Sequence, residues 1–211
     1  MQPRNNRLNP PLLALGLFLI FNAPIVLALV GEIDFGDGVD LSDDNGIYVT
    51  VLARYSGRDL AQVQQVYDLC PDKDDLPVIL DLAAATGKSP GFILALRGQK
   101  VSWWEISVGL EVDANDWFLP VTQTPRPPYA IVYDNWKAAG EGGRTLWLSD
   151  DDCRNLAAAR FLHRYFQVTV ARAMEMRVGG AKLEKVAADE VRRRQGSDRF
   201  KARKVADGSS S

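Results

Sequence analysis

Few side chains in this sequence could carry catalytic chemistry, and their spacing matches no common catalytic site. The single histidine, His163, is predicted to lie on a helix over residues 155–166. Ser/His/Asp catalysis needs a histidine within hydrogen-bond reach of a nucleophile. A helical histidine between Leu162 and Arg164 is more typical of a surface or partly packed position. We therefore expect no catalytic residues and a non-enzymatic protein.

Cofactor and metal sites are not expected either. One histidine and two cysteines cannot form a Cys/His metal cluster. The glycines of residues 140–143 lack the Lys-Ser/Thr pair of a phosphate-binding loop. Acidic residues between 34 and 44 do not have the spacing of a calcium-binding EF-hand. We interpret residues 32–46 as a solvated acidic linker.

The two cysteines lie in different parts of the chain. Outside the cytoplasm, a cysteine pair is more often oxidised than free. We predict one disulfide between Cys70 and Cys153. The alternative is that both are small buried core residues.

Aromatic residues between 103 and 136 form the candidate interaction surface. Two adjacent tryptophans on one helix cannot face the same way, so at least one is expected to pack against the following segment or to be exposed. Exposed rings suit an extended peptide or a glycan, because they offer contact area at low entropy cost. Packing in the core is the alternative. The residues are Trp103, Trp104, Trp117, Phe118, Tyr129, Tyr133 and Trp136.

A pattern that occurs three times predicts the elements that position these residues. In each copy an apolar helix ends at a residue suited to the left-handed conformation, and a side chain two positions later can start the next helix. The pairs are Gly57 with Asp59, Gly87 with Ser89, and Gln167 with Thr169. We predict a mainly all-α fold of repeated helix-turn-helix units, packed as a small right-handed helical array.

Composition sets the expected boundaries of these repeats. Residues 47–119 are predicted to hold the first two repeats and residues 149–194 the third. Residues 120–148 are rich in Pro, Gly and aromatic residues and are predicted to be an irregular connector. Within the connector, a short β-hairpin is predicted from Tyr129–Tyr133 and Thr145–Leu148.

Both ends of the chain differ in composition from the repeats. Residues 12–30 are almost wholly apolar and follow two arginines, so residues 1–31 are predicted to be a signal peptide or an amino-terminal transmembrane anchor. Either form places the domain outside the cytoplasm, in the periplasm or anchored to the inner membrane on the periplasmic side. Residues 195–211 are predicted to be a disordered basic tail.

Three stretches resemble a group of predicted exported bacterial proteins of unknown function. They are DLPVIL at residues 75–80, SWWEIS at residues 102–107 and PPYAIVYDNWK at residues 127–137. The resemblance covers most of residues 47–190. It implies a helical architecture and a location in the bacterial envelope.

These observations favour a non-enzymatic envelope protein that presents a helical-repeat surface to another envelope or membrane protein, such as an accessory subunit of a membrane complex. One alternative is a glycan- or peptide-binding module that uses a tryptophan-lined groove. A distant alternative is a membrane-anchored helix-turn-helix regulator that binds DNA. Between residues 88 and 98, only Lys88 and Arg97 are basic, too few for phosphate contacts, so no nucleic-acid partner is expected.

Overall fold

The computed structural model describes residues 43–140 and 146–208, with side chains described up to residue 196. Within these ranges the chain forms nine α-helices and two short 3-10 helices and contains no β-strand. The predicted all-α class is therefore confirmed. None of the described helices combines the length and the apolar composition that a bilayer crossing requires. The predicted signal peptide or anchor, residues 1–31, lies outside the described residues.

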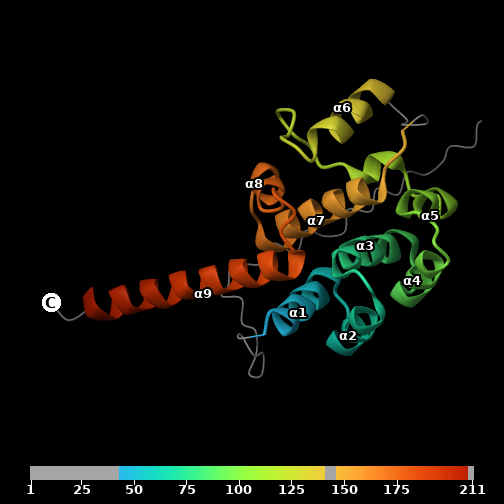
Figure 1. Ribbon diagram of the computed structural model, residues 1–211. Helices are drawn as coiled ribbons and strands as arrows, with labels where there is room; N and C mark the ends of the chain where they lie inside the picture. Colours follow the sequence, from blue (N-terminus) through green and yellow to red (C-terminus); the bar gives the residue numbers. More distant parts are fainter. Residues whose placement is uncertain (1–42, 141–145, 209–211) are drawn as a thin grey trace, which may run out of the picture. The chain divides into compact units, whose positions relative to one another are not determined.

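Most of the helices are short and follow one another closely along the chain (Figure 1). The 3-10 helices, η1 and η2, precede α3 and α6. The elements are α1 (Asp44–Ser56), α2 (Leu60–Leu69), η1 (Lys73–Asp75), α3 (Leu76–Thr86), α4 (Pro90–Gly98), α5 (Trp103–Gly109), η2 (Ala114–Trp117), α6 (Ala130–Ala139), α7 (Asp150–Phe166), α8 (Val170–Glu175) and α9 (Leu183–Gly208).

The first helix of each predicted repeat ends at a left-handed residue. Gly57 ends α1 with a φ of 64°, and Gly87 ends α3 with a φ of 68°. In the third repeat, Gln167 takes the same role at the end of α7 with a φ of 51°. The local turn therefore has the same backbone geometry in all three copies, although only two of them have glycine there.

The second helix of each predicted repeat starts two residues later. Ser89 accepts a hydrogen bond from the backbone N–H of Phe92, and Thr169 accepts one from the backbone N–H of Arg172. Asp59 occupies the equivalent position before α2 without a side-chain cap bond. Two of the three predicted caps are thus formed by the expected side chains.

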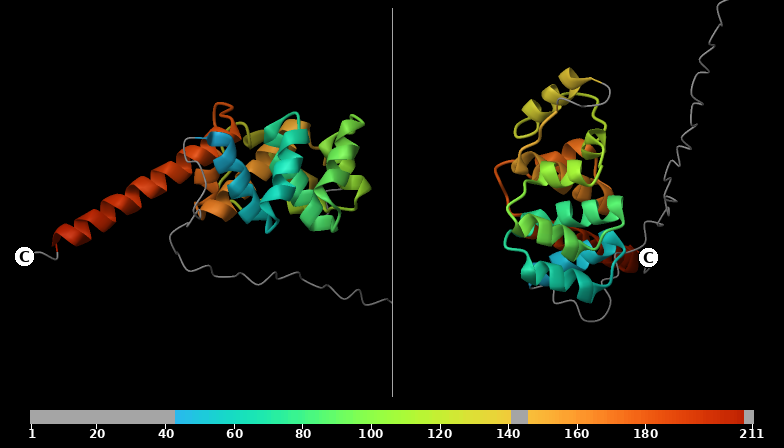
Figure 2. Two further views of the ribbon diagram at one scale, coloured as in Figure 1. Left: turned by 90° about the horizontal axis from the view of Figure 1, so that it is seen from below. Right: turned by 90° about the vertical axis from the view of Figure 1, so that its right-hand side faces the viewer.

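The helices are arranged in layers, with the first helices of the repeats at the centre. Helices α1, α3 and α7 contact one another, and α9 packs along α1. Helices α2 and α4 pack against α1 and α3 respectively, and α5 contacts both α4 and α7 (Figures 1 and 2). Because α4 also contacts α2, the three form a continuous outer row, which we call the α2–α4–α5 layer.

The core between the central helices is aromatic as well as aliphatic. Phe161 of α7 is fully buried, and its ring packs edge to face against Tyr48 at 6.1 Å and Tyr55 at 5.2 Å between centroids. Such aromatic pairs contribute about 0.5–1.5 kcal/mol beyond the burial of area. They hold α7 against α1, so residues far apart in the sequence share one core.

The predicted β-hairpin in the connector is wrong. Residues 130–139 form α6, and residues 146–149 have no regular structure. Tyr133 and Trp136, three residues apart, lie on one helix face and both pack on Phe118, with Trp136 stacked at 4.5 Å between centroids. The Tyr133 hydroxyl also hydrogen-bonds the backbone N–H and carbonyl of Leu119. These contacts need helical spacing, because two residues three apart on a strand would point to opposite faces.

The limits of two predicted segments are corrected at the ends of the described chain. The acidic linker ends at Asp43, because Asp44 begins α1. The predicted disordered tail is helical up to Gly208, as the continuation of α9. Helix α9 contains no proline, and just before the tail Glu190 pairs with Arg193 and Arg194 at i+3 and i+4 spacing, an arrangement that favours a helix.

Candidate functional site

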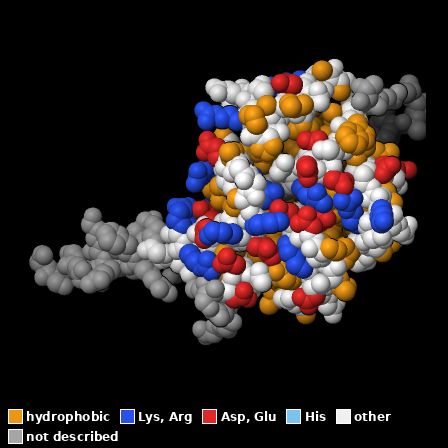
Figure 3. All heavy atoms as spheres, in the orientation of Figure 1, with side chains coloured by type: hydrophobic (Ala, Val, Ile, Leu, Met, Phe, Trp, Pro, Cys, Tyr) orange, Lys and Arg blue, Asp and Glu red, His pale blue; other side chains and the backbone are white. Residues whose placement is uncertain are grey.

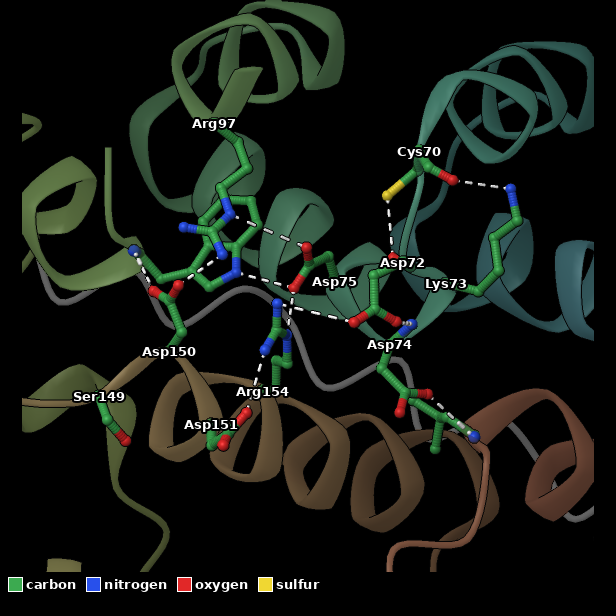
Figure 4. A network of polar contacts seen from close by, with 12 residues as sticks. Cys70, Asp72, Lys73, Asp74, Asp75, Arg97, Ser149, Asp150, Asp151 and Arg154 are labelled. Carbon is green, nitrogen blue, oxygen red and sulfur yellow. Dashed lines mark hydrogen bonds and ion pairs between the residues drawn. The ribbon is translucent and has the colours of Figure 1, made fainter. Parts of the chain in front are cut away.

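A buried carboxylate, Asp75, is the centre of the polar network that joins α3, α4 and α5 to α7 (Figure 4). Its side chain is 7% exposed. One oxygen accepts hydrogen bonds from the indole N–H of Trp103 at 2.8 Å and from Nε of Arg154 at 2.6 Å. Arg97 Nε lies 3.9 Å from the other oxygen. Asp75 therefore links α3 to α4, α5 and α7.

A second aspartate, Asp150 at the start of α7, completes this side of the network. It accepts a hydrogen bond from the backbone N–H of Trp103 at 2.8 Å and pairs with the guanidinium of Arg97. Arg97 also donates to the carbonyl of Val101 and lies 4.9 Å from the centre of the Trp103 ring. The guanidinium is thus held by two acids, a carbonyl and an aromatic face.

A similar arrangement holds the end of the third repeat. Arg177 is buried and pairs with Asp74 at 3.3 Å, and Asp74 also accepts a hydrogen bond from the backbone N–H of Leu183 at 3.0 Å. Arg177 occupies the repeat position that corresponds to Arg97. Both arginines therefore reach acidic residues in or beside the first helix of a repeat.

These polar groups satisfy one another, which indicates a structural role. Arg154 is shared by Asp72, Asp75 and Asp151, and the Asp72 side chain also accepts a backbone N–H. Within the described part of the chain, no cluster of His, Cys, Asp and Glu side chains could hold a metal ion. Apart from Nε of Arg177, which has no hydrogen-bond partner, the buried groups of this network are paired, and such pairing favours a unique packing of the helices.

The predicted aromatic surface is mostly interior. Trp103, Trp117 and Tyr133 are at most 2% exposed, and Phe118 and Tyr129 are also buried. Trp104 and Trp136 are partly buried and pack against the core. The alternative interpretation of these residues as core is the one that the structure supports. The adjacent tryptophans do point differently, since Trp103 is buried and Trp104 is not.

The structure contains Cys70 and Cys153 as two free, buried thiols rather than the predicted disulfide. The Cys70 thiol donates to the carbonyl of Asp72 at 3.0 Å. Burial and the nearby charge of Asp75 raise the pKa of Cys70 to about 12, and burial likewise raises the pKa of Cys153. Neither thiol is therefore a ready nucleophile near neutral pH, since the thiolate is the reactive form.

His163 lies in the last turn of α7 and contacts the turn between α7 and α8. Its Nδ1 is 2.6 Å from the carbonyl oxygen of Val168, just beyond the left-handed residue Gln167. The histidine thus joins the end of α7 to the residue that precedes the Thr169 cap. This placement agrees with the predicted partly packed position.

Among the described residues, four of the seven exposed large apolar side chains lie on the α2–α4–α5 layer. Leu60 and Leu69 of α2 are 51% and 72% exposed, Phe92 of α4 is 44% exposed and Val108 of α5 is 56% exposed. Elsewhere, Ile131, Trp147 and Val178 are exposed singly. On the face seen in Figure 3, basic and acidic side chains are interspersed with apolar ones. The α2–α4–α5 layer is the candidate functional site.

One pattern in the sequence indicates the polar network, and little in the sequence indicates the exposed layer. Arg97 and Arg177 occupy the same position of the repeat, and acids precede α3 and α7. Pairing between these groups could have been proposed from that pattern. The exposure of Phe92 could not have been predicted from the sequence, because an aromatic residue on a helix usually faces the core.

No protein-family model, no curated protein and no solved structure matches this chain.

Proposed function

We propose that this protein is a non-enzymatic scaffold that presents the α2–α4–α5 layer to another protein. The observation that carries the proposal is the exposure of Leu60, Leu69, Phe92 and Val108 on three helices that form a row, in which α4 contacts both α2 and α5. Exposed apolar side chains placed singly are ordinary, whereas several on neighbouring helices favour an interaction site.

The charges of the α2–α4–α5 layer are consistent with a docking role. The exposed Asp68 is hydrogen-bonded by Gln64 at 2.7 Å, and Glu105 is held in the capping box of Ser102. Arg97, the basic residue in the last turn of α4, is drawn inward by Asp150. Helix α4 itself therefore carries no unpaired charged side chain, and burying its outer face against a partner costs little desolvation.

The rigid attachment of this layer is a further support. Asp75 and its partners tie the start of α3 to α4, α5 and α7. An interface that is already ordered loses less conformational entropy when it binds. The network therefore holds the α2–α4–α5 layer in place before a partner binds.

We further propose that this scaffold works outside the cytoplasm, where its partner is an envelope or membrane protein. The support is the sequence of residues 12–30, an apolar stretch that follows Arg4 and Arg7. An accessory subunit of a membrane complex would have this combination of export segment and docking surface.

The test compares native complexes formed by full-length variants in the source organism. Leu69→Ser/Phe92→Ser removes apolar area from the proposed surface, and Ile131→Ser/Val178→Ser removes it from exposed positions elsewhere. We expect the first variant to lose the high-molecular-weight species on native gels, because removing interface anchors costs about 2 kcal/mol or more each. The second should retain it. Equal behaviour of the two variants, with unchanged circular dichroism, would refute the proposal.

A further inference from the structure

We infer that α4 binds an acidic amphipathic helix of the partner protein, an inference that rests on the proposed function. The inference is based on a stripe of exposed apolar side chains on α4 that has a free lysine at each end. Phe92 and Ala95 are exposed on α4, and Lys88 and Lys100 lie just before and just after this helix.

Within the described part of the protein, neither lysine pairs with an acidic side chain, whereas Arg97, between them, is paired with Asp150. The Lys88 ammonium lies 5.9 Å from the centre of the Phe92 ring, so charge and apolar surface are adjacent. Lys100 is held at a φ of 63°, a left-handed conformation that glycine would adopt more easily.

The spacing of these groups fits a helix better than an extended peptide. The 9 residues of α4 make it about 13 Å long at 1.5 Å per residue, or roughly two and a half turns. A partner helix laid along α4 would place an apolar residue on Phe92 and acids two to three turns apart beside the lysines. The neighbouring α2 adds Leu69 to the same layer. Helices bound in this way present apolar anchors at i, i+3 or i+4 and i+7.

Phosphate-bearing ligands fit less well. Binding to nucleic acid needs several Lys and Arg contacts, and only two free bases flank this stripe. An anionic membrane attracts each base weakly, and tight binding takes a cluster of four or more. The apolar residues between the lysines favour a protein helix whose acids complement them.

The experiment places a photo-reactive phenylalanine analogue at position 92 of the full-length protein in the source organism. A second protein carries the analogue at position 178, because Val178 is 52% exposed and lies away from the layer. Mass spectrometry identifies the cross-linked segment. We expect position 92 to capture a protein segment with apolar residues at i and i+3 or i+4 and acids two to three turns apart.

Charge reversal tests the role of the lysines in the same assay. Lys88→Glu/Lys100→Glu should reduce the cross-linking yield about threefold or more for each lysine, because each ion pair is replaced by repulsion. Lys137→Glu/Lys182→Glu makes the same change in net charge elsewhere and should leave the yield unchanged.

The other outcomes separate this inference from the proposed function. Cross-linking to a segment without acids, or a yield insensitive to Lys88→Glu/Lys100→Glu, overturns the acidic helix while leaving a docking surface. Capture of lipid, nucleic acid or a second copy of this chain also overturns it. Cross-linking at position 92 no stronger than at position 178 overturns both proposals.

Discussion

The indole N–H of Trp103 donates a 2.8 Å hydrogen bond to the buried carboxylate of Asp75, across 28 residues of sequence. This bond joins the first turn of α5 to the start of α3. The same carboxylate oxygen is hydrogen-bonded by Arg154 of α7. A single acid thus determines how three helices meet, and its removal tests the whole junction.

Asp75→Asn should destabilise the protein strongly. The substitution keeps the size of the side chain but removes the buried one of the three acidic partners of Arg154, whose side chain is 20% exposed. Breaking one side of a buried ion pair costs about 3–5 kcal/mol. Urea unfolding followed by tryptophan fluorescence measures the change. Asp68→Asn, at an exposed position on α2, is the control and should change the unfolding free energy by less than about 0.5 kcal/mol. Similar values for the two variants would contradict the structural role of Asp75.

Two substitutions at the left-handed residues that end α3 and α7 should have opposite effects on the free energy of unfolding. Gly87→Ala should lower the unfolding free energy by about 1–2 kcal/mol, because alanine is strained at a φ of 68°. A Cβ there would meet nothing within 4 Å, so the effect is confined to the backbone. Gln167→Gly should raise the unfolding free energy by up to about 1 kcal/mol, because Gln167 has a φ of 51°. Thermal unfolding measures both, and a loss of stability in Gln167→Gly would show that its side chain matters more than its backbone.

Alkaline pH should destabilise the protein through its tyrosines. Burial is the main cause that raises the pKa of all six, Tyr48, Tyr55, Tyr67, Tyr129, Tyr133 and Tyr165. The unfolded chain loses these protons near pH 10, whereas the folded protein keeps them to higher pH. Stability is therefore full below pH about 10 and is lost as the pH rises above it. Urea titrations from about pH 8 to about pH 11, a range that spans the tyrosine pKa of the unfolded chain near 10, measure this loss.

A tyrosine variant separates this effect from general alkaline damage. The Tyr55 hydroxyl donates to Asp81 at 2.6 Å, and the charge of Asp81 adds to the effect of burial in raising the pKa of Tyr55. Tyr55→Phe should be less stable at neutral pH but should lose less further stability as the pH rises. The same pH slope in the variant and the wild type would contradict the assignment to Tyr55.

Thiol counting tests the state of the two cysteines. Cys70 and Cys153 are buried and free, and burial raises the pKa of both thiols. An alkylating reagent should add two labels to the protein unfolded without reductant. It should add none during a short exposure of the folded protein at neutral pH. Intact mass measures both, and an unlabelled unfolded chain would show that the predicted disulfide forms after all.

The sequence by itself determined the local turns. The pairs Gly57 with Asp59 and Gly87 with Ser89 predicted two corners, because left-handed conformation and helix capping depend on the residues at the turn. Ser102 and Glu105 likewise form the capping box that starts α5. Gln167 was recognisable as the third corner only by its place in the repeat, since glutamine has no strong preference for that conformation.

Only the tertiary structure decided what the side chains of these helices face. The segment Tyr129–Tyr133 was predicted as a strand from composition, and it is helical because Tyr133 and Trp136 must reach Phe118 together. Trp103 is buried because Asp75 and Asp150, 28 and 47 residues away, meet its two N–H groups. Phe92 is exposed although it stands on an apolar helix. Local preference is a property of a few neighbouring residues, whereas burial and pairing depend on which distant helices meet.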